Sequence, residues 1–128
     1  GARVLAVSRQ MGKLAGLMNR YHDRLIWQSA DLRSHEGREQ VLARAREMGG
    51  VNVLINAAGV NRFALFDQID VQALDQLLDI NLQAALQLTR VCLPLLRAQP
   101  RALAVNVGST YGSIGNPGDA TYCASKFA

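Results

Sequence analysis

Two residues near the C-terminal end of the sequence could perform acid–base chemistry. Tyr122 and Lys126 are four positions apart, in the segment Tyr122-Cys123-Ala124-Ser125-Lys126. On a helix, side chains at this spacing lie one turn apart on the same face. A lysine ammonium stabilises a nearby phenolate, because an opposite charge favours the ionised form. Such a neighbour moves a tyrosine from its ordinary pKa of about 10 toward the range that general acid–base catalysis needs at neutral pH.

A third polar side chain could join this pair. Ser109 comes thirteen residues before Tyr122 and follows an apolar stretch that predicts a strand. A hydroxyl at the end of a strand could reach the oxygen of a bound carbonyl group. Taken alone, a tyrosine and a lysine at this spacing are more often part of an exposed helix surface, so the elements around them must decide.

Strands and helices alternate along the chain. Short apolar runs predict strands over 4–7, 25–27, 51–55 and 103–107. Apolar residues at helical spacing predict helices over 10–21 and 34–48, a helix from 70 that runs through or restarts near 80–81 and ends before 100, and a helix from 121. The strand over 51–55 is apolar at four of its five positions, which is typical of a strand covered on both faces. This order predicts an α/β fold, a doubly wound parallel sheet with helices on both faces.

Length and composition exclude several classes of protein. The chain has 128 residues, 49% of them hydrophobic and 19% charged, as in one globular domain with one core. Its longest apolar runs are far shorter than the roughly 20 residues of a membrane span. Cys92 and Cys123 form no CxxC pattern, so neither a disulfide framework nor a metal site is expected. The net charge is +4, but the 14 Lys and Arg residues are scattered, so nucleic acid is not an expected partner.

Four motifs along the chain resemble those of the short-chain dehydrogenase/reductase family, in its classical branch. Ser109, the glycine-rich loop after it, and Tyr122 with Lys126 resemble the active-site region of that family. The segment Asp79-Ile80-Asn81-Leu82 resembles the helix motif that carries the fourth catalytic residue, an asparagine. Two motifs resemble the cofactor site: Asn56-Ala57-Ala58-Gly59, with alanine at the second place of the family's Asn-Asn-Ala-Gly, and Asp31-Leu32, whose acidic residue usually meets the adenine ring.

The resemblance implies an oxidoreductase that transfers a hydride between NADP(H) and a small carbonyl or alcohol substrate. In such an enzyme Tyr122 is the general acid and base, and Lys126 assists it and holds the nicotinamide ribose. Ser109 orients the substrate oxygen, and Asn81 supports a proton relay. These four residues are the expected catalytic set.

The cofactor is expected to be NADP, with NAD as the alternative. Ser8 stands where an NAD-dependent enzyme carries an acidic residue for the ribose 2′-hydroxyl, and Arg9 beside it suits a 2′-phosphate. A solvated loop arginine is the other interpretation of Arg9. The expected cofactor-binding residues are Ser8, Arg9, Asp31, Leu32, Asn56, Ala57, Ala58, Gly59, Tyr122 and Lys126.

The sequence departs from the family at both ends. It begins at Gly1, without the Gly-rich phosphate loop and the strand that come before this point in the family, and it stops two residues after Lys126. We therefore expect a single partial, Rossmann-like NAD(P)-binding domain over 1–128, with a gap in the sheet between the strands over 4–7 and 51–55. Two other functions stay open: an inactive fragment that acts only as a binding or assembly piece, and an extended-type epimerase or dehydratase.

The helix over 82–96 predicts an assembly. It carries apolar residues on more than one stripe, whereas one stripe is enough to cover a sheet. In the family this helix and the one that begins near Tyr122 form a contact between two subunits. A homodimer or homotetramer is therefore expected. The sequence contains no recognisable signal peptide, and a cytoplasmic protein is expected.

Overall fold

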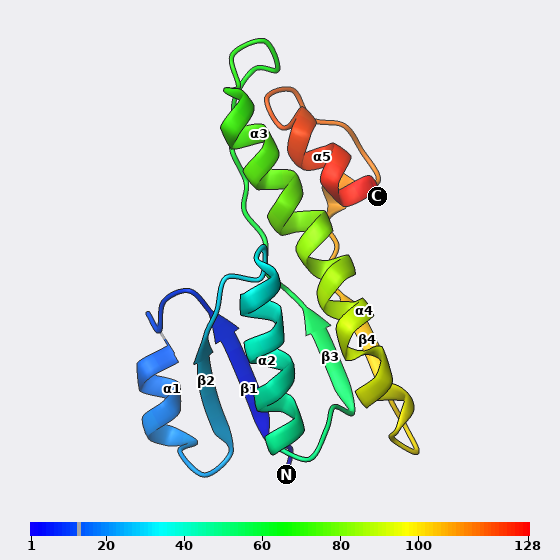
Figure 1. Ribbon diagram of the computed structural model, residues 1–128. Helices are drawn as coiled ribbons and strands as arrows, with labels where there is room; N and C mark the ends of the chain where they lie inside the picture. The colour runs from blue at the N-terminus through cyan, green and yellow to red at the C-terminus, as the bar shows by residue number, and fades with distance from the viewer. Residues whose placement is uncertain (13) are drawn as a thin grey trace.

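Four short parallel strands form the centre of the computed structural model, which describes residues 1–12 and 14–128. They pair two by two (Figure 1): β1 (Val4–Ser8) with β2 (Leu25–Ser29), and β3 (Val53–Asn56) with β4 (Leu103–Asn106). The predicted α/β class and the parallel direction of the strands are confirmed. All four predicted strands are present, with ends that shift by up to two residues.

The two strand pairs are separate sheets in the described part of the chain, because no hydrogen bonds join β1 to β3. The gap lies where the sequence predicts it, between the strands that begin at Val4 and Val53. Leu5 of β1 and Leu54 of β3 nevertheless pack against the same buried cluster. Side-chain packing from one layer of helices therefore holds the two pairs together.

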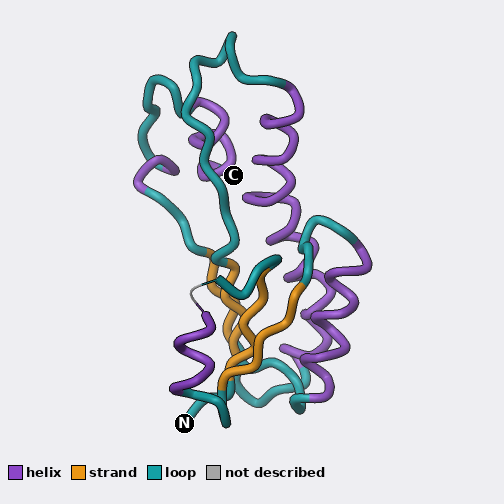
Figure 2. The backbone as a smooth tube through the Cα atoms, turned by 90° about the vertical axis from the view of Figure 1, so that its left-hand side faces the viewer, coloured by secondary structure: helices purple, strands orange, loops and turns teal. Residues whose placement is uncertain are grey.

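Helices cover both faces of this layer of strands (Figure 2). The helix α1 (Leu14–Arg20) lies on one face, and α2 (His35–Glu47) and α4 (Ala84–Arg97) lie on the other. The core forms beneath α2 and α4, and its buried members are Ala30, Val41, Leu42, Leu88, Cys92 and Leu96. The pKa of the Cys92 thiol is raised, because burial disfavours the thiolate.

Local sequence signals explain where α2 begins and ends. The Ser34 side chain accepts a hydrogen bond from the Gly37 amide at 2.9 Å and so caps the first turn. At the other end, Gly49 and Gly50 have φ angles of 95° and 108°, a region that glycine reaches without strain. Their amides donate to carbonyls of the last helical turn. The two glycines therefore end α2.

A long helical segment rises from the sheet and passes the ends of the strands (Figure 1). It consists of α3 (Val71–Leu78), a π-helical turn η1 (Asp79–Gln83) and α4. The last helix, α5 (Ala120–Phe127), packs beside α3. The helix therefore runs through the region of Asn81 rather than restarting there, and its wider turn is of a kind often found at functional sites.

Two predictions about local structure are wrong. The helix expected over 10–21 begins only at Leu14, because Gly12 has a φ of 46° in a turn; Lys13 lies outside the described residues. The strand over 51–55 is not covered on both faces: Val53 and Ile55 are 53% and 59% exposed. Within the described residues, α1 packs against β2 and leaves the outer face of β3 open. None of the helices described in the structure is long and apolar enough to cross a membrane.

Candidate active site

Polar side chains tie the ends of β3 and β4 to the long helix. Asn56, the last residue of β3, donates through Nδ2 to Asn106 Oδ1 at 2.8 Å and to Thr89 Oγ1 at 2.9 Å. Asn106 is the last residue of β4, and Thr89 lies on α4. The amide hydrogens of Asn56 are therefore used inside the protein. Asn56 holds the strand ends in place, and the exposed Ala57 follows it.

Asn81 is the centre of a second cluster, in the π-helical turn. The residue is 8% exposed, and its side chain exchanges two hydrogen bonds with the backbone of Val60: the Val60 amide donates to Oδ1 at 2.8 Å, and Nδ2 donates to the Val60 carbonyl at 2.9 Å. Nδ2 also donates to Ser125 Oγ at 3.0 Å. Ser125 Oγ in turn donates to the Tyr122 carbonyl at 2.7 Å. Asn81 thus connects the segment after β3 to helix α5.

Tyr122 and Lys126 lie beside this cluster. Lys126 Nζ is 5.8 Å from the centroid of the Tyr122 ring and donates to the Val107 carbonyl at 3.0 Å. Gly59 also adjoins it, since a Cβ at position 59 would lie 3.4 Å from Asn81 Oδ1 and 4.0 Å from Lys126 Nζ. The structure therefore brings together Tyr122, Lys126, Asn81 and Gly59, which the sequence places in three separate motifs.

Ser109 begins the short loop that packs against α5. Its Oγ accepts a hydrogen bond from the Tyr111 amide at 3.2 Å, at the start of the 3-10 turn η2 (Thr110–Gly112). The Tyr111 ring meets the Tyr122 ring edge to face, at 6.2 Å between centroids and 83° between planes. Tyr111 could not be predicted as part of the site, because a single aromatic residue in a glycine-rich loop carries no periodic signal.

A buried carboxylate joins two loops at the beginning of α5. Asp119 is 4% exposed, and it accepts hydrogen bonds from Asn61 Nδ2 at 2.9 Å and from Asn116 Nδ2 at 2.5 Å. One residue before it, the Gly118 carbonyl accepts from the Ala64 amide at 2.8 Å. These contacts fix the segment 61–64 against the N-terminal end of α5. Asp119 is not among the residues that the sequence predicts for the site.

A pocket of about 230 Å³ opens beyond the ends of β1 and β2. Six of the expected cofactor-binding residues line it: Ser8, Arg9, Asp31, Leu32, Ala58 and Gly59. The other lining residues are Val7, Ala30, Arg33, Val60, Ile80 and Ala84. Asn56, Ala57, Tyr122 and Lys126 do not line this pocket. Gly59 belongs to the pocket and also adjoins Lys126, so the pocket and the cluster around Asn81 meet there.

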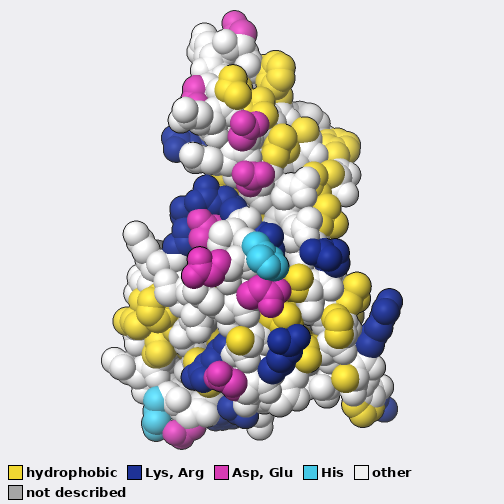
Figure 3. All heavy atoms as spheres, viewed as in Figure 1, with side chains coloured by type: hydrophobic (Ala, Val, Ile, Leu, Met, Phe, Trp, Pro, Cys, Tyr) yellow, Lys and Arg dark blue, Asp and Glu magenta, His cyan; other side chains and the backbone are white. Residues whose placement is uncertain are grey.

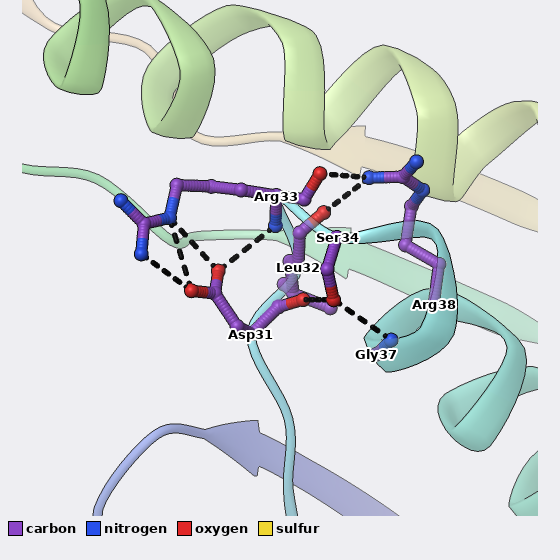
Figure 4. A network of polar contacts seen from close by, with 6 residues as sticks. All are labelled: Asp31, Leu32, Arg33, Ser34, Gly37 and Arg38. Carbon is purple, nitrogen blue, oxygen red and sulfur yellow. Dashed lines mark hydrogen bonds and ion pairs between the residues drawn. The ribbon is translucent and has the colours of Figure 1, made fainter.

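Asp31 and Arg33, which both line the pocket, form an ion pair with each other (Figure 4). Arg33 Nε donates to both carboxylate oxygens of Asp31, at 2.9 and 3.1 Å, and Nη2 donates to Oδ2 at 2.5 Å. The hydrogen bond from Arg33 is the main reason why the pKa of Asp31 is lowered to about 2, and the charge of Arg9 acts in the same direction. Acidic and basic side chains gather at mid-height of the molecule (Figure 3). Arg33 is not among the residues that the sequence predicts for the cofactor site.

Of the two residues expected to select the cofactor, Ser8 has a hydroxyl that is already hydrogen-bonded, and Arg9 has an exposed side chain. The Ser8 hydroxyl donates to the Gln10 carbonyl at 2.6 Å and accepts from Trp27 Nε1 at 2.9 Å. Arg9 is exposed at the pocket, and its charge is close enough to Asp31 to lower the pKa of that carboxyl group. Arg9 is therefore the residue of this pair whose side chain can turn to a ligand.

Comparison with known proteins identifies the family. The sequence model of the short chain dehydrogenases matches residues 1–128. Nodulation protein G of Rhizobium meliloti (strain 1021) is 34% identical over 127 residues, 98% of this chain and 52% of that protein. The 3-oxoacyl-[acyl-carrier-protein] reductase of Bos taurus is 32% identical over 127 residues, 98% of this chain and 54% of that protein. The chain spans about half the length of the curated relatives it matches.

Solved structures show the same arrangement of elements. A short-chain dehydrogenase from Streptomyces avermitilis superposes with a TM-score of 0.92 at 29% identity, over 100% of this chain and 48% of that one. A metagenomic short-chain oxidoreductase in complex with NADP superposes with a TM-score of 0.90 at 26% identity, over 99% of this chain and 60% of that one. The doubly wound fold predicted from the sequence is confirmed, and the chain belongs to the short-chain dehydrogenase family.

Proposed function

We propose that the protein containing this chain is an oxidoreductase that transfers a hydride between NADP(H) and a carbonyl/alcohol pair. The observation that carries the proposal is the convergence of Tyr122, Lys126, Asn81 and Gly59 at the edge of the pocket. In this proposal, residues 1–128 are part of one NAD(P)-binding domain. NAD remains the alternative cofactor.

The residues present fit a dinucleotide. The pocket beyond β1 and β2 offers the exposed guanidinium group of Arg9 to a phosphate at the adenosine end. It meets the Tyr122–Lys126 cluster at Gly59, whose missing side chain leaves room for a ligand next to the backbone. The pocket would therefore hold the adenosine end, and the segment 57–60 would direct the nicotinamide end toward Lys126. When bound, the nicotinamide supplies or accepts the hydride.

Tyr122 is the proposed general acid in reduction and general base in oxidation. Its hydroxyl gives a proton to the substrate oxygen in one direction and takes it back in the other. The Lys126 ammonium, 5.8 Å from the ring centroid, stabilises the negative charge that the phenolate then carries. Lys126 also holds the nicotinamide ribose in this proposal.

Ser109 is the proposed donor to the substrate oxygen. Its Oγ accepts from the Tyr111 amide at 3.2 Å, and this bond directs the hydroxyl without using its hydrogen. That hydrogen can therefore be donated to a carbonyl oxygen and can polarise it. The edge-to-face contact of Tyr111 with Tyr122 keeps the loop that begins at Ser109 next to the phenol ring of Tyr122.

Asn81 has a positioning role in the proposal. Both hydrogens of its amide group are used, by the Val60 carbonyl and by Ser125 Oγ, so its side chain does not reach the substrate. It supports proton transfer by fixing Ser125, and hence Tyr122, relative to the segment that carries Gly59.

The test is NADPH-dependent reduction of a panel of ketones by the natural gene product that contains this chain. Tyr122→Phe is expected to lower kcat by at least about 100-fold, because general acid–base catalysis contributes about 10²–10⁴-fold. Tyr21→Phe is the matched control, since it removes the same hydroxyl from an exposed residue that follows α1. Tyr122→Phe with the activity of Tyr21→Phe would overturn the mechanism.

We further propose that the protein is cytoplasmic and is a homodimer or homotetramer. Leu88, Cys92 and Leu96 of α4 are buried in the core, whereas Leu86 and Leu93 on the same helix are 57% and 36% exposed. A second subunit would cover this second stripe. Sedimentation equilibrium is expected to show a dimer or tetramer at micromolar concentration. A fully active monomer would contradict the proposal.

A further inference from the structure

We propose that Arg33, acting through its ion pair with Asp31, determines how strongly the pocket prefers a 2′-phosphorylated adenosine over an unphosphorylated one. This inference rests on the proposed function, in which the pocket holds the adenosine end of a dinucleotide. Arg33 is a positioning residue in this proposal, and Arg9 is the residue that meets the phosphate.

The first observation is that the carboxylate of Asp31 is fully engaged. Arg33 places its guanidinium fork across both oxygens, at 2.9 and 3.1 Å from Nε, and its own backbone amide donates to Oδ1 at 3.0 Å. Four hydrogen bonds from one residue reach this carboxylate. An adenine amino group could bind Asp31 only at the expense of these bonds.

The second observation is that the loop carrying this pair is held rigidly (Figure 4). Ser34 Oγ lies between the Asp31 carbonyl, at 3.0 Å, and the Gly37 amide, at 2.9 Å. Arg38 Nη1 donates to the carbonyls of Leu32 and Arg33, both at 2.7 Å. With its backbone fixed from both sides, the ion pair is set before a ligand arrives, which lowers the entropy that binding must overcome.

The third observation is the charge that remains at the pocket. Arg9, Asp31 and Arg33 line it, and the pairing of Asp31 with Arg33 leaves the charge of Arg9 uncancelled. Without Arg33, the Asp31 carboxylate would be bare beside Arg9 and would cancel its charge. A bare carboxylate repels a phosphate dianion, because like charges repel. Arg33 therefore makes the pocket suitable for a phosphate, although the pocket contains an aspartate.

The experiment measures the dissociation constants of NADPH and NADH for the natural gene product by fluorescence titration. Arg33→Ala is expected to shift the ratio of the two constants by about tenfold toward NADH. The reason is that the bare Asp31 carboxylate would cancel the charge with which Arg9 attracts the phosphate. Arg33→Lys keeps the charge and is expected to restore most of the NADPH preference. Arg44→Ala is the matched control: it removes an arginine paired with Glu47 on the exposed face of α2, and it should leave the ratio unchanged.

Variants made in the Asp31→Asn protein distinguish an effect of Arg33 through Asp31 from a direct contact of Arg33 with the phosphate. In Asp31→Asn, removing Arg33 is expected to change the ratio by less than about twofold, because no carboxylate is left to be exposed. An equal shift in both backgrounds, or no shift for Arg33→Ala alone, would overturn the inference. If Arg33→Ala does not fold, Arg33→Gln takes its place with the same expectation. Failure of the unmodified protein to bind either nucleotide would overturn the proposed function, and this inference with it.

Discussion

Replacing Gly112 with alanine is expected to displace helix α5 and, with it, Tyr122 and Lys126. A Cβ at position 112 would lie 2.4 Å from the Lys126 carbonyl oxygen and 3.1 Å from its carbonyl carbon. Both atoms belong to the backbone of α5, so no side-chain rotation can relieve the overlap. Because the φ angle of Gly112 is not positive, the added methyl group acts through its volume alone.

The size of the displacement follows from the contact distance. A Cβ essentially never approaches another heavy atom closer than 3.0 Å, so the 2.4 Å gap must open by about 0.6 Å. Overpacking of this kind costs about 1–3 kcal/mol of folding free energy. A misplacement of about 1 Å can lower a catalytic rate about 100-fold, so a shift of this size is expected to lower kcat/KM by about tenfold.

The assay compares kcat/KM for NADPH-dependent ketone reduction, together with the midpoint of urea unfolding, in Gly112→Ala and Gly115→Ala. Gly115 lies in the same loop, has no positive φ, and a Cβ there would meet nothing within 4 Å. The control is therefore expected to keep both the activity and the midpoint. Equal kcat/KM values in the two variants would refute the reasoning that contact between η2 and α5 positions the proposed catalytic residues.

Two further predictions concern single hydrogen-bonded residues. Asn81→Ala leaves the amide and carbonyl of Val60 without their partner, and the free energy of unfolding in urea is expected to fall by about 2–3 kcal/mol; a loss below about 0.5 kcal/mol would contradict the assigned role. The folded-state pKa of Asp31, about 2 against an ordinary value of 3.8, is depressed, so its ionised form stabilises the fold above about pH 4 and that contribution is lost as the pH falls toward 2. Because the Asp31 side chain is 34% exposed, screening reduces the contribution to about 1 kcal/mol, and the stability difference between the unmodified protein and Asp31→Asn should close over that pH range.

Much of the fold could be predicted because its signals are local. The cap at Ser34 and the glycines at 49 and 50 act on neighbouring backbone groups, so a short window of sequence contains everything that sets the two ends of α2. The exposure of the outer face of β3, as the described residues show it, could not be predicted in the same way. Ile55 is apolar whether or not a helix covers it, because side-chain type records a tendency to be buried and not the element that buries it.

In the candidate site, too, local contacts could be predicted from the sequence and contacts between distant segments could not. Tyr122 and Lys126 are one helical turn apart, so their proximity follows from the sequence. The contact of Asp119 with Asn61 joins residues 58 positions apart and depends on two loops that only the complete fold brings together. The pairing of Arg33 with Asp31 is local but depends on a choice of side-chain conformation, because an arginine two residues from an aspartate has many other positions open to it.

The π-helical turn explains why one asparagine can connect the two halves of the site. Before the turn, α3 packs against α5; after it, α4 packs against α2 and the strands. The extra residue in the π-helical turn rotates the face of the helix that is buried, from the face that packs on α5 to the face that packs on α2 and the strands. Asn81 lies in this turn. At this point the Asn81 side chain must accept a hydrogen bond from the Val60 N–H. It must also donate hydrogen bonds to the Val60 carbonyl and to Ser125 Oγ. Aspartate lacks the donors and leucine lacks both, so only a side chain with an amide at this length can hold Gly59 and Tyr122 at a fixed separation.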